Sequence, residues 1–268
     1  MGCAALLKKA SLVGAFFVSA IWLGAAQAFC PMPDGLPSAQ VQKVVDGDTL
    51  RLKDGRSVRL IGLNTPELGR QSRSVEPFAE AARRRLQALV AASDGRVRLQ
   101  VGSQAKDHYG RTLAHAYDAR GGNLEAQLLA EGLGYWLAVA PNLALVECQR
   151  AAERSARQAR LGLWRQAQAQ VQTPVQLHRG GFALVHGEVL RVERNRGGVW
   201  LEMGGSLVLQ VPEKLFEHFD VGQLQGLAGS RVEARGWVID RAKRGGLKAS
   251  QARWMLPLTD RAMLEVLP

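Results

Sequence analysis

The alternation of apolar and polar residues between Gln40 and Leu63 limits the fold more than any other feature of this sequence. Three runs in this segment, V-Q-K-V-V-D, T-L-R-L-K and S-V-R-L-I-G-L, alternate apolar with polar side chains. This is the pattern of strands with one buried face. Between the second and third runs, Asp54-Gly55 is a turn pair that joins antiparallel strands. The segment therefore predicts a three-stranded meander.

The pattern changes after Pro77 and then returns. Residues 78–92 carry apolar side chains at helical spacing, and residues 96–101 and 112–117 alternate again. Two further helices are expected, one from Asn123 to Gly132 and one over residues 143–160. Strands with helices inserted between and after them predict a mainly β fold with helices, built on a five-stranded Greek-key barrel of the OB type.

A second domain is expected at the carboxyl end of the chain. Residues 166–181 are polar, contain proline and lack a period, as is typical of a linker. Beyond them the strand pattern returns, with a short helical turn near residues 213–219. We predict a first domain over residues 40–165, preceded by an extension over residues 29–39, and a second, smaller OB-like β domain over residues 182–268.

The first 28 residues have the pattern of a secretory signal peptide. Lys8 and Lys9 precede an uncharged apolar run over residues 10–26, and A-Q-A at residues 26–28 supplies the small residues of a cleavage site. An uncleaved anchor is the alternative, although the run is shorter than the ~20 residues that a membrane span prefers. We expect an exported protein, periplasmic or secreted, with no stable membrane association after cleavage.

Export also affects the cysteines. Cleavage leaves Cys30 and Cys148 in a compartment where thiols oxidise. A disulfide that ties the new N-terminus to a helix is one interpretation and two unrelated thiols is the other, because pairing cannot be read from sequence. The chain is strongly basic, with a net charge of +11, and it stays basic once the signal is removed.

Separated pieces of the first domain carry oxygen ligands that neighbouring strand ends bring to one edge of the barrel. Asp48 begins the second strand, while Asn64 and Thr65 follow the third. Carboxylate, amide and hydroxyl or main-chain oxygens are the hard ligands that Ca²⁺ takes. These three residues are therefore the candidate metal ligands.

The same edge holds groups suited to phosphodiester hydrolysis. Arg59 and Arg111 supply fork-shaped donors that match phosphate oxygens. Glu67, two positions past Thr65, is free to take a proton from an attacking water. A cation and two guanidinium groups would stabilise the extra negative charge of the transition state.

Several ordered motifs within residues 40–164 resemble the staphylococcal nuclease (thermonuclease) family. They are V-V-D-G-D-T-L, R-L-I-G-L-N-T-P-E, D-H-Y-G-R, and N-L-E-A-Q-L-L-A-E-G-L with A-A-E-R-S-A-R-Q-A-R-L-G-L-W. The resemblance implies an OB-fold enzyme that binds Ca²⁺ and hydrolyses DNA and RNA at the P–O5′ bond, leaving 3′-phosphates. By motif position it implies metal ligation by Asp48 and Thr65 and a catalytic trio of Arg59, Glu67 and Arg111.

Two departures from the family's pattern bear on activity. Asn64 stands where a second metal carboxylate is usual, and because an amide oxygen brings no charge, the affinity for metal is expected to fall. Ala138 and Ala140 stand where tyrosines flanking a nucleotide-binding surface are expected. Tyr109 matches the remaining, phosphate-side tyrosine, and the aromatic pair Tyr135-Trp136 is a candidate to compensate for the missing rings.

The second domain shows no catalytic set. It holds Trp200, Trp237 and Trp254, and a basic run over residues 241–248, R-A-K-R-G-G-L-K. These residues suit a surface that stacks bases and follows phosphates. They equally suit core tryptophans beside a solvated hairpin.

The sequence therefore predicts an exported Ca²⁺-dependent nuclease with DNA and RNA as partners and no evident protein partner. A nucleic-acid-binding module whose catalysis has lapsed is the alternative that Asn64 keeps open. An envelope protein that uses both barrels for protein contacts is a more distant alternative. Binding to phosphates weakens steeply with salt, which distinguishes the last possibility from the first two.

Overall fold

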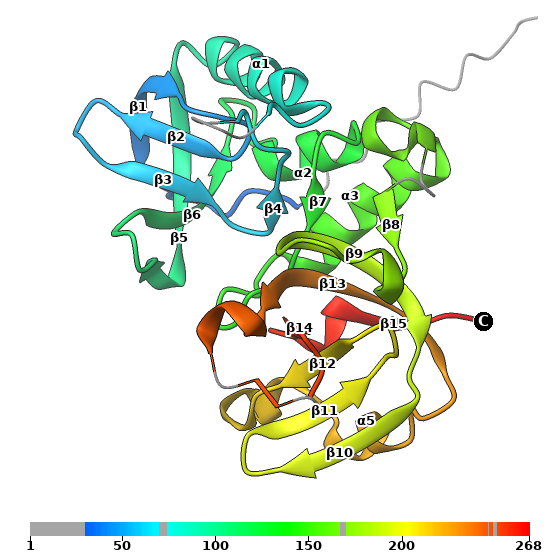
Figure 1. Ribbon diagram of the computed structural model, residues 1–268. Helices are drawn as coiled ribbons and strands as arrows, with labels where there is room; N and C mark the ends of the chain where they lie inside the picture. The colour runs from blue at the N-terminus through cyan, green and yellow to red at the C-terminus, as the bar shows by residue number, and fades with distance from the viewer. Residues whose placement is uncertain (1–29, 70–73, 167–169, 246, 249–250) are drawn as a thin grey trace, which may run out of the picture.

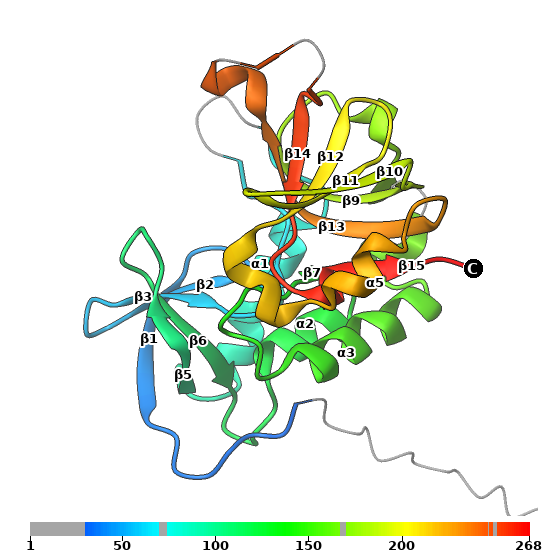
Figure 2. The same cartoon turned by 90° about the horizontal axis from the view of Figure 1, so that it is seen from below.

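A computed structural model describes residues 30–69, 74–166, 170–245, 247–248 and 251–268. The predicted signal peptide lies outside these ranges. Within them, no helix combines the length and the apolar character needed to cross a bilayer. The described chain forms two β-rich units, and the helix α3 (Val146–Gln158) lies along the side where they meet (Figures 1 and 2).

The first unit is a closed barrel of five strands in the order β1-β2-β3-β6-β5. The strands are β1 (Ser38–Val44), β2 (Thr49–Leu52), β3 (Ser57–Leu60), β5 (Arg96–Lys106) and β6 (Thr112–Tyr117). The antiparallel pairing of β1 with β2 and of β2 with β3 confirms the predicted meander. The alternating apolar residues of β2 and β3 are fully buried in the barrel core, because successive side chains of a strand point to opposite faces.

Helices cover this barrel much as the sequence predicts. They are α1 (Ala79–Ala91), α2 (Leu124–Ala130) and α3. The Asn123 side chain accepts a hydrogen bond from the Ala126 amide and so begins α2. The third helix starts at Val146 rather than at residue 143. One reason is that Asn142, just before this segment, is held on β5 by two hydrogen bonds to the Gln104 backbone. Gln104 belongs to β5 because this strand continues past its predicted end at residue 101.

A two-stranded ladder at the edge of the barrel was not anticipated from the sequence. It pairs β4 (Leu63–Asn64) with β7 (Tyr135–Trp136), and Asn64 lies directly opposite Tyr135. The chain turns into β4 at Gly62, which has a positive φ of 80°. A glycine is needed there because other residues rarely adopt that conformation, and because a Cβ atom would overlap the Gln149 side chain.

The second unit is a further β domain, and its presence confirms the predicted fold class together with the first barrel. Its sheet has the order β10-β11-β12-β14-β13-β9-β8, and β15 also pairs with β13. The strands are β8 (Val171–Gln172), β9 (Gly181–Glu188), β10 (Arg191–Asn195), β11 (Gly198–Glu202), β12 (Leu207–Val211), β13 (Arg231–Asp240), β14 (Trp254–Pro257) and β15 (Leu264–Val266). Its helical segments are η2 (Pro174–Gln176), η3 (Glu213–His218), α5 (Val221–Gln225), η4 (Arg241–Arg244) and η5 (Arg261–Met263). A further helical segment, η1 (Gly162–Gln166), follows α3 at the end of the first unit.

Two features of this unit bear on the predicted domain plan. Only two residues separate β9 from β10, so the path from β10 through β11, β12, β14 and β13 returns to its starting segment, in the same pairing order as the first barrel. This order supports the OB-like prediction. In contrast, β8 lies inside the expected linker and pairs with β9, so part of that linker belongs to the sheet of the second unit.

A buried ionic network joins α3 to β13. Arg235 donates hydrogen bonds to Glu153 at 2.9 Å and to Glu233 at 2.7 Å, and these three side chains are at most 5% exposed. Arg157 of α3 also donates to Glu233, at 2.8 and 2.9 Å. Because unpaired buried charges are costly, this network ties the two units together in one relative position.

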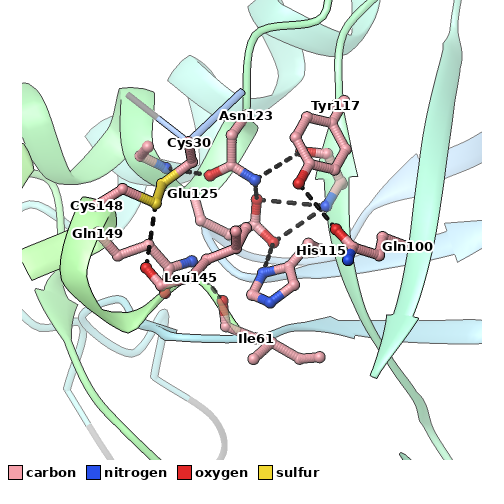
Figure 3. The surroundings of a disulfide bond; sticks show 12 residues. Cys30, Ile61, Gln100, His115, Tyr117, Asn123, Glu125, Leu145, Cys148 and Gln149 are labelled. Atoms are coloured by element: carbon pink, nitrogen blue, oxygen red, sulfur yellow. Dashed lines mark hydrogen bonds and ion pairs between the residues drawn. A yellow bond between two sulfur atoms is a disulfide. The ribbon is translucent and has the colours of Figure 1, made fainter. Parts of the chain in front are cut away.

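Cys30 and Cys148 form a disulfide, with their Cα atoms 5.3 Å apart (Figure 3). The bond fixes the start of the described chain to the first turn of α3. The next residue of that turn, Gln149, donates a hydrogen bond of 2.9 Å to the carbonyl oxygen of Ile61. The disulfide therefore lies one residue from the contact between α3 and the chain segment that leads into β4.

Candidate active site

The candidate site begins at the tight turn Asp46-Gly47-Asp48 between β1 and β2. The Asp48 amide donates to the Asp46 carboxylate at 3.1 Å. This turn packs so closely that a Cβ atom on Gly47 would lie 2.7 Å from both Ala82 of α1 and the Thr65 hydroxyl. The glycine thus allows the turn to approach the segment that follows β4.

Asp48 is the centre of a cluster that joins three distant pieces of the chain. Its Oδ2 atom accepts hydrogen bonds from the Thr65 amide at 3.0 Å and the Thr65 hydroxyl at 3.2 Å. The same oxygen lies 3.2 Å from the Arg59 guanidinium. Its other oxygen accepts from the Thr49 hydroxyl at 3.1 Å. The structure therefore brings together the predicted Asp48, Arg59 and Thr65.

Arg59 reaches this cluster because of the register between β2 and β3, which places it opposite Thr49. Its guanidinium donates to the carbonyl oxygens of Leu60 and Leu63, both at 2.7 Å, and lies 3.5 Å from the Asn64 side-chain oxygen. Several of its donors are thus held by the protein itself. Arg59 fixes the corner between β3 and β4 and also places positive charge beside Asp48 and Asn64.

Asp46 adds a second carboxylate to this edge. Burial, together with the negative charge of Asp48, raises the pKa of Asp46 to about 6. A bound cation would favour the ionised form of this carboxyl group. Among the described residues no three His, Cys, Asp or Glu side chains form a group. The donor set of Asp46, Asp48, Asn64 and Thr65 is nevertheless made of hard oxygen atoms, which fits Ca²⁺.

Arg111 lies at the start of β6, whose neighbour in the barrel is β3. Its Nε atom donates to Asp107 at 2.7 Å, and its amide donates to the other oxygen of the same carboxylate at 2.9 Å. Although burial raises it, the hydrogen bonds from Arg111 hold the pKa of Asp107 below its ordinary value. The guanidinium also lies 5.5 Å from the centre of the Tyr109 ring, which is 74% exposed.

A groove of about 620 Å³ runs from the Asp46 turn past Arg111 and Tyr109. Its lining carries more basic than acidic side chains. Besides Asp46 and Arg111, the charged lining residues are Arg51, Arg56 and Lys106. The three additional cations were missed in the sequence. Arg51 could have been found from the alternation of side chains in β2. Thr49 and Arg51 are alternate residues and therefore share the face of the strand that lines the groove.

Glu67 follows the cluster on an exposed loop. Its amide donates to the Glu76 carboxylate at 2.9 Å, and its carbonyl oxygen accepts from the Glu76 amide, also at 2.9 Å. These two bonds hold the backbone of Glu67 and leave its carboxylate on the surface. The structure thus places Glu67 on the loop that follows Thr65.

The second unit covers one of the two positions where stacking tyrosines were expected, and Ala140 stays partly exposed. Ala138 is fully buried, its amide lies 3.1 Å from the Met263 sulfur, and its carbonyl oxygen accepts a hydrogen bond from Thr259. A tyrosine ring at residue 138 has no room beneath this unit. The packing of the second unit therefore accounts for the alanine at residue 138.

A model of the family described as "Staphylococcal nuclease homologue" matches residues 57–166, a range that includes Arg59, Glu67 and Arg111. The thermonuclease of Staphylococcus intermedius is 34% identical over 128 residues, which are 46% of this chain and 74% of that protein. The chain belongs to the staphylococcal nuclease family. This membership agrees with the closed five-stranded barrel and its helices.

Two further relatives of this nuclease-family protein show the same extent of similarity. The thermonuclease of Staphylococcus hyicus is 32% identical over 132 residues, covering 47% of this chain and 74% of that protein. Endonuclease YncB of Bacillus subtilis (strain 168) is 31% identical over 134 residues, covering 48% of this chain and 62% of that protein. The family match ends at residue 166, so the second β unit lies beyond it.

Proposed function

We propose that this protein is an exported, Ca²⁺-dependent nuclease that hydrolyses phosphodiester bonds of DNA and RNA. The observation that carries the proposal is the contact of Asp48 with both Thr65 and Arg59. It gathers metal-type oxygen ligands and a guanidinium at one edge of the barrel, and a basic groove containing Arg111 leads away from the neighbouring Asp46. The names of the relatives, two thermonucleases and an endonuclease, support the same reaction class.

The proposed reaction is the attack of water on phosphorus. Glu67 takes the proton of the water as its oxygen forms the new bond to phosphorus. The bond to O5′ then breaks, the leaving oxygen takes up a proton, and the products are a 3′-phosphate and a 5′-hydroxyl. Arg59 and Arg111 stabilise the charge that develops on the phosphate oxygens. The exposed position of the Glu67 carboxylate leaves it free to reach a bound water.

Asp48, Asn64 and Thr65 would hold the Ca²⁺ ion, with Asp46 beside them. A bound cation supplies positive charge against the phosphate oxygens and favours ionisation of water. The protein's own contribution is to keep these oxygen atoms at one edge: the Thr65 amide and hydroxyl orient Asp48, and Arg59 orients the Asn64 corner. Since Asn64 brings no charge, the predicted affinity is lower than for a site with a carboxylate there.

Export is supported by the Cys30–Cys148 disulfide, because disulfides persist in oxidising compartments. The signal-like pattern of residues 1–28 is consistent with that location.

The test is hydrolysis of single-stranded DNA and RNA by residues 29–268, with Ca²⁺ and with a chelator. We expect Ca²⁺-dependent cutting and a lower Ca²⁺ concentration for half-maximal rate in Asn64→Asp. Gln176→Glu is the matched control, because its side-chain oxygen accepts from the Thr173 amide and hydroxyl and a glutamate keeps that role. Binding without any cutting by the wild type would instead favour the lapsed nucleic-acid-binding module.

A further inference from the structure

A row of side chains crosses the outer face of the second unit. Phe182 of β9 lies opposite Trp237 of β13, Pro257 of β14 lies opposite Gln210 of β12, and Gln210 lies opposite Trp200 of β11. Continuing the pairing of β13 with β14 by two residues places Pro257 opposite Trp237. Residues opposite each other on neighbouring strands share a face of the sheet, so these five side chains form one outer row.

This outer row is accessible, unlike the third tryptophan of the unit. Trp237 is 41% exposed, whereas Trp254 is only 5% exposed. Of the two interpretations that the sequence left open for the tryptophans, the core interpretation therefore holds for Trp254. Phe182 and Trp200 are half-buried. Four strand-to-strand spacings separate them, a path of about 19 Å along the curved sheet.

The outer row begins next to the proposed catalytic edge. The Phe182 ring lies 5.4 Å from Tyr135 on one side and 5.4 Å from Trp237 on the other. Tyr135 in turn lies opposite Asn64 in the ladder of β4 and β7. Burial raises the pKa of Tyr135, and the negative charge of Glu76, whose carboxylate accepts from the Glu67 amide, raises it further. A chain of aromatic rings thus leads from the Asn64 corner onto the second unit.

Positive charge borders the far end of the outer row. Arg241 lies 5.8 Å from the centre of the Trp200 ring, and the segment that follows it carries the exposed Lys243 and Lys248. The acidic groups nearby are paired. Glu193 and Glu202 both contact Arg191, at 2.5 and 2.8 Å, and Asp240 contacts Arg253 at 2.8 Å.

Resting on the proposed nuclease function of the first unit, we infer that the outer row binds single-stranded nucleic acid and holds the strand that enters the catalytic edge. Unpaired bases stack on aromatic rings, while Arg241 and the two lysines meet the phosphates. A duplex keeps its bases stacked on one another and does not offer them to the rings. DNA and RNA share this chemistry, so both are tested.

The experiment measures binding of fluorescent 20-nucleotide DNA and RNA single strands to protein carrying Glu67→Gln, which prevents cleavage. In that background, Trp237→Ala and Trp200→Ala are each expected to weaken binding roughly 5- to 150-fold. Trp237→Phe, which retains a ring, is expected to recover most of the loss. Val175→Ala removes a 78% exposed apolar side chain elsewhere on the unit and is expected to change nothing.

Two results would overturn the inference. One is binding by Trp237→Ala and Trp200→Ala that matches the Val175→Ala control. The other is equal, tryptophan-dependent binding of an acidic polypeptide such as polyglutamate, which has no bases to stack. Hydrolysis by the wild-type protein is measured separately. Loss of single-strand binding in the tryptophan variants, in a protein that cuts nothing, would support the surface and contradict only the nuclease mechanism.

Discussion

At the scale of single residues, the proposed chemistry rests on Glu67, because its carboxylate is exposed while its backbone is fixed by Glu76. Glu67→Gln removes the base but keeps the shape and the backbone hydrogen bonds. We expect the hydrolysis rate to fall ~10²- to 10⁴-fold, with single-strand affinity close to that of the wild type. Glu147→Gln, the same charge change at an exposed position in the first turn of α3, should leave both quantities unchanged. Parallel loss of binding and rate would show that Glu67 is not the base.

Arg59 makes a different prediction because its guanidinium already bonds two carbonyl oxygens and touches Asp48. A lysine at this position offers one ammonium group and cannot make the same set of contacts. Arg59→Lys should therefore lower kcat by at least ~10²-fold and also lower the melting temperature. The measurements are steady-state kinetics and thermal unfolding, with Arg84→Lys on the exposed face of α1 as the control. A lower melting temperature with a normal kcat would assign Arg59 a structural role only.

At the scale of secondary-structure elements, the sequence predicted most strands because each has one buried and one exposed face. The prediction from sequence failed where contacts between distant parts of the chain determine the local structure. The β4–β7 ladder is two residues long on each side, too short to leave a period. α5 is another short element, begun by the Asp220 side chain, which accepts from the Gln223 amide.

The candidate site shows the same division. Motif order predicted that Asp48, Arg59 and Thr65 lie together, because strand ends in a barrel share an edge. The burial of Ala138 depends on Thr259 and Met263, more than a hundred residues away, and no local pattern reports such a contact.

The interface between α3 and β13 leads to a prediction about pH. Although burial raises it, hydrogen bonds from Arg157 and the charge of Arg235 hold the pKa of Glu233 far below its ordinary value of 4.5. A carboxyl group with a depressed pKa in the folded state stabilises the fold above its ordinary pKa, and this contribution is lost as the pH falls. His186 of β9 also contacts Glu233, at 2.7 Å, so the carboxylate faces three basic side chains.

Glu233→Gln should therefore destabilise the protein by about 1–3 kcal/mol near pH 7, since Arg157 loses its carboxylate partner and the buried Arg235 keeps only Glu153. The difference from wild type should shrink as the pH falls from ~6 to ~3. Denaturant unfolding across this range provides the measurement. Glu202→Gln is the control because it disrupts an exposed pair with Arg191, for which a loss below ~1 kcal/mol is expected. A wild-type advantage that stays constant with pH would contradict the assignment of a paired, ionised Glu233.

At the scale of the whole molecule, the two β-rich units share one hydrophobic cluster, and the disulfide links the start of the first unit to α3. The cysteines are 118 residues apart in sequence, so the bond removes many conformations from the unfolded chain. Cys148 also neighbours Gln149, which holds the Ile61 carbonyl oxygen below the Asn64 corner. The bond is thus expected to stabilise the barrel and the segment that carries the candidate site.

Cys148→Ser should accordingly lower the free energy of unfolding by about 2–5 kcal/mol. Urea unfolding of the wild type with and without a thiol reductant should show the same loss, because reduction opens the same loop. The Cys148→Ser variant itself should not respond to the reductant, which separates the disulfide from other effects of the reagent. Below the unfolding transition, kcat should change little, since neither sulfur touches the proposed catalytic residues. An unfolding midpoint that is unaffected both by the reductant and by the substitution would show that the bond contributes nothing to the stability of the molecule.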